Sequence, residues 1–358
     1  MKAPLEVKSA PYTSPKQDEI VIKNGAVAIN PIDWLKGQSD LGGLIFSWIK
    51  LPFVFGEDVA GEVAEVGSAV TRFRVGDRVV AHAVGIEAKY NSSAYSAFQT
   101  YTVVLDQVTS PIPSTLSYES AAVIPLGLST AACGLFQTDH LALQYPSSRP
   151  NPTRKTLLVW AGSTSVGVNA IQLAVAAGYE VFTTCSPRNF ELVKKLGASQ
   201  VFDYNSKTVV KDLIHALEGK TTAGALSIGP GAAEKCLDIL DKCDGDKFLS
   251  MATYPAPATP PKRFVVPQMA YSFISFSIST FIKSKARGIR YKFIVGDSLI
   301  HNEVGKAIYV DFLPKALAEG TYVAAPEPHV VGKGLEKIQT AYDFQRKGVS
   351  AKKVVVSL

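Results

Sequence analysis

The stretch Thr156–Ser186, TLLVWAGSTSVGVNAIQLAVAAGYEVFTTCS, constrains the fold more than any other part of the sequence. Thr156–Ala161 is a short apolar run with β-branched residues, Val166–Ala177 carries apolar residues at helical spacing, and Tyr179–Cys185 is another apolar run. These patterns predict a strand, a helix that stops at Gly178, and a second strand. A βαβ unit of about 30 residues has the size needed to hold the pyrophosphate of a dinucleotide.

The turn inside this unit, Gly162–Gly167, has the outline of G-x-G-x-x-G with Thr164 at the middle glycine. Gly162 is expected to allow the tight turn and Gly167 the close approach of helix and strand, so that backbone N–H groups face the phosphates. Thr164 crowds the pyrophosphate but adds a hydroxyl donor, which makes the turn a hydroxyl-rich clamp. The alternative is a βαβ unit that binds no nucleotide. The predicted phosphate-binding residues are Gly162, Ser163, Thr164, Ser165 and Val166.

Length and composition bound the remaining possibilities. A chain of 358 residues suits two domains, and 47% hydrophobic with 19% charged residues indicates a globular protein. The net charge of +6 is mild and scattered, so no nucleic-acid partner is predicted. The four cysteines are widely spaced without a C-x-x-C pattern, which favours reduced core thiols in a cytoplasmic protein.

No signal peptide is visible, but the uncharged stretch Phe264–Ile282 needs an explanation. A membrane helix is possible by length. Because Ser and Thr alternate with Phe and Ile, the pattern instead favours a strand or a pocket wall, and no membrane partner is predicted.

The order of the predicted elements indicates two kinds of domain. Residues 1–127 hold short strands between glycine turns, which suggests a compact, partly open barrel. Leu116–Phe136 is predicted to be helical. Strands and helices then alternate, which predicts a parallel sheet wound on both faces. The clearest elements are strands at Glu19–Asn30, Val54–Val66, Asp77–Ala83, Gln200–Asp203, Gly224–Ile228, Lys247–Met251 and Lys353–Ser357, and helices at Glu191–Leu196, Val209–Leu217, Ala232–Leu240, Tyr309–Ala318 and Gly334–Gln345.

Several segments together resemble one family. Gly56–Gly67 (GEDVAGEVAEVG), followed by Phe73-x-Val75-Gly76-Asp77-Arg78-Val79, resembles the barrel signature of the medium-chain dehydrogenase/reductases. The nucleotide turn and the ending Gly348–Val356 lie where that family has them, so the resemblance covers nearly the full length. Within the family, the chain is most similar to the zinc-independent quinone and enoyl reductases. Ala28–Trp34 and Thr183–Pro187 resemble the fungal trans-acting enoyl reductases of polyketide synthesis.

The resemblance implies an α/β fold: a GroES-like β-barrel domain built from both chain ends (1–127 and 297–358) and an inserted doubly wound Rossmann domain (128–296). The chain departs from the family in two ways. The family usually has a further strand before Glu19–Asn30. Its NP-x-DWK motif has Lys directly after Trp, whereas here Leu35 follows Trp34 and Lys36 comes next.

No metal site is predicted. Zinc alcohol dehydrogenases of the superfamily need Cys and His ligands for the catalytic ion and four closely spaced Cys for the structural ion. Here the corresponding motif reads Gly56-Glu57-Asp58 without His, and neither the Cys nor the His residues show ligand spacing. The soft ligands that zinc prefers are therefore missing in the required number.

The end of the second strand favours NADPH. Ser186 lies 24 residues after Gly162, close to the roughly 20-residue spacing at which NAD enzymes carry an acid for the ribose 2′-OH. Residues 183–188 contain hydroxyls and Arg188 but no carboxylate, a set that suits a 2′-phosphate. The alternative is that Arg188 is a solvated charge. The predicted residues at this end are Ser186, Pro187, Arg188, Asn189 and, from the resemblance, Tyr204, for which the alternative is a packed aromatic.

The family position places Asn30–Lys36 and Ile124–Thr130 beside the nicotinamide. Thr130, Lys36 and Asp33 are the catalytic candidates, with helix capping or surface charge as the alternative for each. The resemblance also implies a substrate pocket that includes the apolar stretch Phe264–Ile282, which equally suits a subunit interface. The remaining predicted cofactor-binding residues are Asn30, Ile32, Asp33, Trp34, Thr130, Val349 and Ser350, and the predicted substrate residues are Gly127, Leu128, Val295 and Gly296.

Without zinc, alcohol oxidation lacks its Lewis acid, whereas a nicotinamide enzyme can still reduce an activated C=C bond. The first hypothesis is an NADPH-dependent reductase of small apolar α,β-unsaturated carbonyls or carrier-bound acyl substrates. A quinone oxidoreductase similar to ζ-crystallin and a non-catalytic NADPH-binding protein remain alternatives. Either a monomer or a homodimer is expected.

Overall fold

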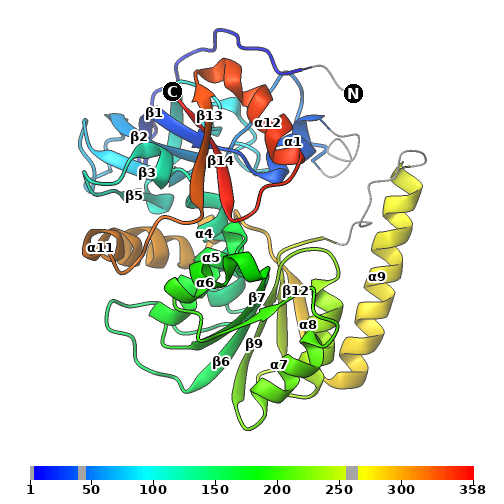
Figure 1. The fold of residues 1–358 in the computed structure, drawn as a ribbon. Helices are drawn as coiled ribbons and strands as arrows, with labels where there is room; N and C mark the ends of the chain where they lie inside the picture. The colour runs from blue at the N-terminus through cyan, green and yellow to red at the C-terminus, as the bar shows by residue number, and fades with distance from the viewer. Residues whose placement is uncertain (1–3, 39–45, 255–264) are drawn as a thin grey trace. The chain divides into compact units, whose positions relative to one another are not determined.

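The computed structural model describes residues 4–38, 46–254 and 265–358 (Figure 1). It divides into two compact units. The first unit consists of Met1–Ser129 with Ile300–Leu358, and the second of Thr130–Leu299.

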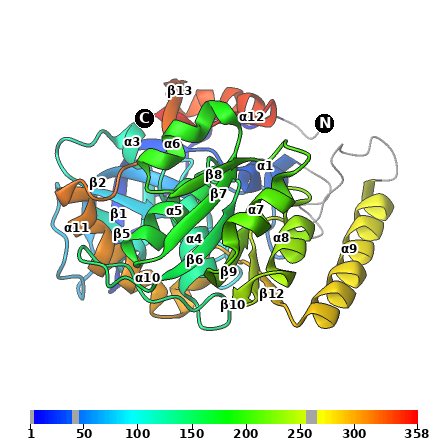
Figure 2. The same cartoon turned by 60° about the horizontal axis from the view of Figure 1, so that its bottom comes forward.

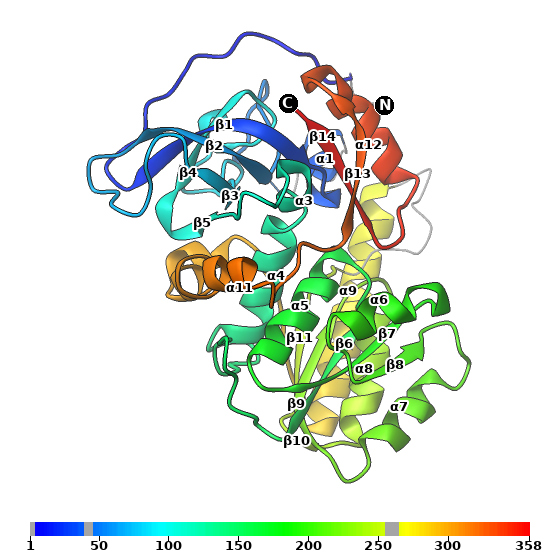
Figure 3. The same ribbon diagram turned by 60° about the vertical axis from the view of Figure 1, so that its left-hand side comes forward.

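The first unit is built on a mixed sheet that joins both ends of the chain. Within the described ranges the strand order is β13-β14-β1-β2-β3-β5, with β4 also paired to β1. The last strand pairs with the first through Val27 and Val356, as Figure 3 shows for β1 and β14. Only the β13–β14 pair among these is parallel. The strands are β1 Glu19–Ala28, β2 Asp58–Val66, β3 Arg78–His82, β4 Tyr101–Leu105, β5 Thr109–Pro111, β13 Glu327–Lys333 and β14 Lys352–Ser357.

Apolar residues on the inner faces of these strands form the core of the first unit. Ile20, Ile22 and Val59 pack with Val354 of the last strand, and Tyr342 of α12 closes over them. The sequence prediction of a barrel-like domain is therefore confirmed. The helices of this unit are α1 Pro31–Gln38, α3 Tyr118–Ala121, the start of α4 Pro125–Phe136, α10 Val304–Lys306, α11 Leu313–Glu319 and α12 Ile338–Arg346, with short helical turns at Ser93–Tyr95, Asp106–Val108, Ala307–Phe312 and Leu335–Lys337.

The second unit contains a parallel sheet with the order β12-β11-β9-β6-β7-β8, and the short β10 pairs with β9. This is the doubly wound arrangement that the alternating pattern predicts. Helices α7, α8 and α9 follow one another along the sheet (Figure 2). The strands are β6 Lys155–Trp160, β7 Glu180–Cys185, β8 Gln200–Asp203, β9 Thr221–Ser227, β10 Asp244–Gly245, β11 Phe248–Met251 and β12 Arg290–Phe293. The helices are α5 Ser165–Ala176, α6 Phe190–Lys195, α7 Val209–Leu217, α8 Ala232–Asp241 and α9 Val265–Arg287, with helical turns at Pro187–Asn189 and Ser298–His301.

The prediction of a strand for Phe264–Ile282 is wrong. Phe264 lies outside the described residues, and Val265–Arg287 forms the helix α9. Tyr271, Ile274 and Ile278 on this helix are more than half exposed. The serines at 272, 275, 277 and 279 produced an alternation that resembles a strand over only eight residues. The helix has a topological reason, because β11 and β12 are parallel neighbours and such strands need a crossover connection.

Leu116–Phe136 contains two helices, α3, which ends at Ala121, and α4, which begins at Pro125. Among the described residues, Tyr118–Phe136 is the one helical stretch long and apolar enough to cross a membrane by length and composition. Its apolar window is 78% buried inside the fold, and burial of this extent is the property of a core helix.

Candidate functional site

The turn between β6 and α5 is shaped by two residues that the motif does not single out. The positive φ, +66°, falls on Ala161 and not on Gly162. The Thr164 hydroxyl donates to Ala161 O at 2.8 Å and accepts from Gly167 N at 3.1 Å. Thr164 is therefore the N-cap of α5. The hydroxyl is engaged within the turn in this structure, and the expectation that it donates to a phosphate stays a prediction.

Gly162 and Gly167 are required for space. A Cβ on Gly162 would lie 2.1 Å from Thr183 Oγ1, and one on Gly167 would lie 2.4 Å from Ala161 O. The strands β6 and β7 and the helix α5 can approach this closely only because both residues lack a side chain. The second contact is with a backbone carbonyl, which cannot move away without deforming the turn.

This turn can hold an anion. The first N–H groups of an α-helix have no partner within the helix, and the helix dipole favours negative charge there. Asn189 Nδ2 donates to Ser163 Oγ at 3.2 Å, so the residues after β7 lie against the turn. The structure thus brings the two predicted cofactor segments, Gly162–Val166 and Ser186–Asn189, together within the second unit, in an arrangement that fits a dinucleotide pyrophosphate.

The end of β7 carries the residues predicted to contact the 2′-phosphate. Ser186 precedes the helical turn Pro187–Asn189, Arg188 is exposed, and Tyr204 is 40% exposed in the loop after β8. Sequence reasoning missed Asp203. It is the last residue of β8 and pairs with Cys185 of β7. Its carboxylate accepts from Asn205 N at 3.0 Å and, after burial, is the second cause that raises the pKa of Cys185 to about 11. A carboxylate therefore neighbours this end from the next strand.

In the first unit, the predicted nicotinamide-binding residues lie on α1. Asp33 is 1% exposed, and its carboxylate accepts from Asn30 N at 2.7 Å, as in a capping box. Trp34 packs against α12, where its Nε1 donates to Gln345 Oε1 at 2.6 Å. Ile32 is half-buried, and Lys36 belongs to α1 while its side chain lies outside the described residues. Burial, followed by the nearby Glu57, raises the pKa of Asp33 well above its usual range.

Asp58 connects α1 to α4. Its Oδ2 accepts from Asn30 Nδ2 at 2.7 Å, and its Oδ1 accepts from Leu126 N at 2.6 Å. Lys353 of β14 lies 2.9 Å from Asp58 Oδ2, and its ammonium donates to Asn30 Oδ1 at 2.5 Å. Asp58 and Lys353 are 0% and 4% exposed, so this ion pair is buried. The segments Asn30–Lys36 and Ile124–Ser129 are therefore joined within the first unit.

The remaining predicted residues lie in both units. Gly127 and Leu128 are buried in the first turns of α4, and Thr130 is half-buried further along that helix. Val349 and Ser350 follow α12 on an exposed loop. In the second unit, Val295 O accepts from Ser298 Oγ at 2.6 Å and Gly296 O lies 3.7 Å from Cys133 Sγ. Burial raises the pKa of Cys133 to about 12, which excludes a reactive thiolate at neutral pH.

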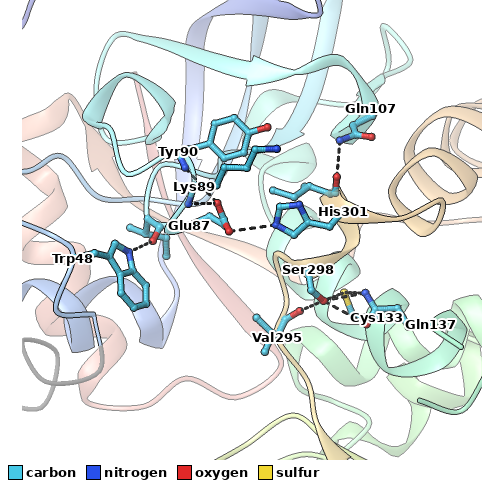
Figure 4. Close-up of polar contacts among 12 residues, drawn as sticks. Trp48, Glu87, Lys89, Tyr90, Gln107, Cys133, Gln137, Val295, Ser298 and His301 are labelled. Carbon is cyan, nitrogen blue, oxygen red and sulfur yellow. Dashed lines mark hydrogen bonds and ion pairs between the residues drawn. The ribbon is translucent and has the colours of Figure 1, made fainter. Parts of the chain in front are cut away.

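Sequence reasoning also missed a pair within the first unit, Glu87 and His301, which Figure 4 draws. His301 Nε2 lies 3.3 Å from Glu87 Oε1, and the other carboxylate oxygen accepts from Lys89 N at 2.7 Å. The carboxylate fixes the orientation of the imidazole ring. With 214 positions between the partners, no local pattern could have found the pair.

The part of the chain described by the structure contains no group of three or more His, Cys, Asp or Glu residues arranged to hold a metal ion. The four cysteines are buried and free, at positions 133, 185, 236 and 243. The absence of zinc stays a prediction that rests on the residue types at Gly56-Glu57-Asp58.

Two family models match the chain. The alcohol dehydrogenase GroES-like domain matches residues 16–114, and the zinc-binding dehydrogenase model matches residues 165–272. The dehydrogenase pigH of Monascus ruber is 58% identical over 100% of this chain and 97% of its own length. The trans-enoyl reductase himH of Aspergillus japonicus is 35% identical over 95% and 90%.

Solved structures agree on the fold. A quinone oxidoreductase from Coxiella burnetii superposes with a TM-score of 0.65 at 22% identity, over 98% of this chain and 93% of that one. A mycobacterial protein complexed with NADPH gives a TM-score of 0.67 at 21% identity, over 98% and 94%. At such identities the likeness concerns the fold alone.

The chain belongs to the medium-chain dehydrogenase/reductase family. It is an oxidoreductase, and members of this family use a nicotinamide cofactor, NADH or NADPH.

Proposed function

We propose that the protein is an NADPH-dependent, zinc-free reductase of activated C=C bonds. The proposal rests on the residue types of the Gly56-Glu57-Asp58 motif and on the contact that Asp58 makes. Where zinc enzymes of the family need a His, this chain has Glu57, and the carboxylate of Asp58 is bound by the ammonium of Lys353 at 2.9 Å. This donor set is a carboxylate–ammonium pair and differs from the thiolate and imidazole set that zinc prefers.

The second unit supplies the proposed cofactor site. The N-terminus of α5 and the turn at 162–166 would hold the pyrophosphate, while Ser186 and the exposed Arg188 would bind the 2′-phosphate. Asp203 opposes that charge, but its carboxylate already accepts from the backbone and side chain of Asn205. Bound NADPH would supply a hydride to the electron-poor β-carbon of the substrate.

The chain's own residues would orient the reacting groups and handle the proton. Thr130 can donate to a carbonyl oxygen or to the nicotinamide ribose. Burial, followed by Glu57, raises the pKa of Asp33, but Asp33 is buried and caps α1, so its direct role requires access to the enolate. His301, oriented by Glu87, is a further candidate for proton delivery. Substituting Thr130, Asp33 and His301 one at a time, with NADPH oxidation as the measurement, identifies the proton donor.

The named activity of relatives supports an acyl or enoyl substrate, because himH and a further relative, tndF of Aspergillus flavipes, are trans-enoyl reductases. We propose a small apolar α,β-unsaturated carbonyl, free or bound to a carrier. The four buried free thiols suit a reducing cytoplasm, which we propose as the location.

The test is NADPH oxidation, followed at saturating cofactor with a panel of enones, quinones and enoyl thioesters, free and carrier-bound. We expect turnover of conjugated C=C substrates with NADPH in preference to NADH. Turnover confined to quinones would assign the alternative oxidoreductase activity. Tight NADPH binding with no turnover of any acceptor would refute both enzyme assignments and support a non-catalytic NADPH-binding protein.

A further inference from the structure

Lys353 is a charged residue at a place where the fold favours an apolar one. In β14, Lys353–Val356 are all buried, and Val354 and Val356 belong to the core of the first unit. A buried ion pair is often replaced by apolar residues with no loss of stability or with a gain. Stability alone is therefore a weak reason for a lysine at this position, and its contacts indicate a more specific role.

The ammonium of Lys353 contacts two side chains that belong to different elements. It donates to Asn30 Oδ1 at 2.5 Å and lies 2.9 Å from Asp58 Oδ2. Asn30 in turn donates to the same oxygen of Asp58 at 2.7 Å. The three groups form a closed triangle, in which each side chain fixes the orientation of the other two.

The triangle sets the starts of two helices. Asn30 directly precedes α1, whose first turn is capped by Asp33. The other oxygen of Asp58 holds Leu126 N at the start of α4 at 2.6 Å. Tyr309 steadies the same turn, because its hydroxyl donates to Pro125 O at 2.9 Å. These two helix starts are the segments expected to flank the nicotinamide.

We propose that Lys353 is a positioning residue for hydride transfer, whose ammonium holds the starts of α1 and α4 in register through Asn30 and Asp58. The proposal rests on the proposed reductase function. It assigns to the chain's own amino group the role of the cation that organises this part of the site.

The test compares Lys353→Met with Lys352→Met. Lys352 is the preceding residue on β14, but it is 46% exposed and pairs with Glu327 at 3.5 Å. Hydrogen exchange measured by mass spectrometry on the full chain should rise at 30–38 and 124–129 in Lys353→Met and remain unchanged in Lys352→Met. The kcat for the preferred acceptor should fall about 100-fold, the scale of a 1 Å misplacement, while the NADPH dissociation constant stays within a few-fold.

Two further variants keep the proposal testable if Lys353→Met does not fold. Lys353→Arg retains the charge and should recover most of the lost kcat. The double variant Lys353→Met/Asp58→Asn removes both charges and should fold but stay slow. Unchanged hydrogen exchange at both segments in Lys353→Met would overturn the proposal. A uniform rise over the whole first unit in Lys353→Met and in the double variant would also overturn it. Failure of the reductase function and failure of the positioning role give different results. A wild-type protein without turnover refutes the reductase function. The local rise in hydrogen exchange still decides whether Lys353 positions the two helix starts.

Discussion

The nucleotide turn of the second unit and the triangle of Lys353, Asn30 and Asp58 in the first unit are held in place by different kinds of contact. The turn is assembled from neighbours: Asn189 reaches Ser163 across 26 positions, and Thr164 reaches Gly167 across three. The triangle joins Lys353 to Asn30 across 323 positions. The turn uses backbone groups and neutral hydroxyls, while the triangle uses buried charge. The turn should therefore respond to steric change and the triangle to change of charge.

The largest expected effect is the loss of the buried ion pair. Lys353→Met leaves the Asp58 carboxylate buried without its cation, which should lower the free energy of unfolding by about 3–5 kcal/mol. Urea denaturation followed by far-ultraviolet circular dichroism measures this change. Adding Asp58→Asn should restore most of the lost stability, since the amide oxygen can still accept from Leu126 N, and the amide nitrogen can donate to Asn30 Oδ1 once the Asn30 amide, released by Lys353, turns over. A double variant no more stable than Lys353→Met would show that packing of the lysine chain, and not its charge, dominates.

Asp33→Asn tests the same cluster through pH. Burial and then Glu57 raise the pKa of Asp33, while Asp58 raises it further and Lys353 and the Asn30 N–H oppose the shift. Because the pKa of Asp33 is higher in the folded state than in the unfolded one, wild-type stability is lost as pH rises from the unfolded pKa of about 3.9 toward the folded value. Asp33→Asn cannot ionise, so its stability relative to wild type should increase with pH, by at most about 1.4 kcal/mol per unit.

Thermal unfolding of both proteins between about pH 5 and pH 8, a window above the unfolded pKa, checks this sign. A constant difference across the window would show that the pKa of Asp33 is not raised in the folded state. Asp343→Asn, at a side chain of α12 that is 56% exposed, is the matched control for replacing a carboxylate by an amide.

Sequence reasoning predicted the turn and the sheets because their information is local. Strand runs, the glycines at 162 and 167 and the alternation after Thr156 each lie within one element or its neighbour. It failed where the contacting residues are far apart in the sequence, or where a segment fits both the helical and the strand period. Lys353 was predicted only as part of a strand. Asp203 lies on the strand next to β7, so its carboxylate near Cys185 was missed. The helix α9 was predicted as a strand because its serines also fit a period of two.

The same reasoning named residues of the nucleotide turn without predicting the contacts that they make. Thr164 stands where a donor to phosphate was expected, yet its hydroxyl caps α5. Gly162 was expected to provide the turn conformation, yet Ala161 has the positive φ and Gly162 provides space for Thr183. Such assignments depend on distances of a few tenths of an ångström, and a pattern of letters does not contain them.

Gly167→Ala tests the steric side of the comparison. The added Cβ would lie 2.4 Å from Ala161 O and 2.6 Å from Gly162 Cα, so the turn must open. We expect a loss of about 1–3 kcal/mol in stability, as for overpacked interiors, and weaker NADPH binding by fluorescence titration. Ser165→Ala, in the same turn, adds no atom and should leave the stability nearly unchanged. Full NADPH affinity in Gly167→Ala would show that the pyrophosphate does not depend on this turn.

The smallest expected effect concerns Arg188, the exposed charge at the end of β7. Arg188→Ala should weaken NADPH binding about 10-fold, the scale of one charge-assisted hydrogen bond at a solvated site, and leave NADH binding unchanged. Arg188→Asp should shift the preference toward NADH, because a second carboxylate would join Asp203 in repelling the 2′-phosphate. Isothermal titration with both cofactors measures the two constants, and raising the salt concentration should reduce the difference between wild type and Arg188→Ala. Equal losses for NADPH and NADH would place Arg188 away from the 2′-phosphate. The NADPH preference would then have to come from neutral groups such as Ser186 and Tyr204.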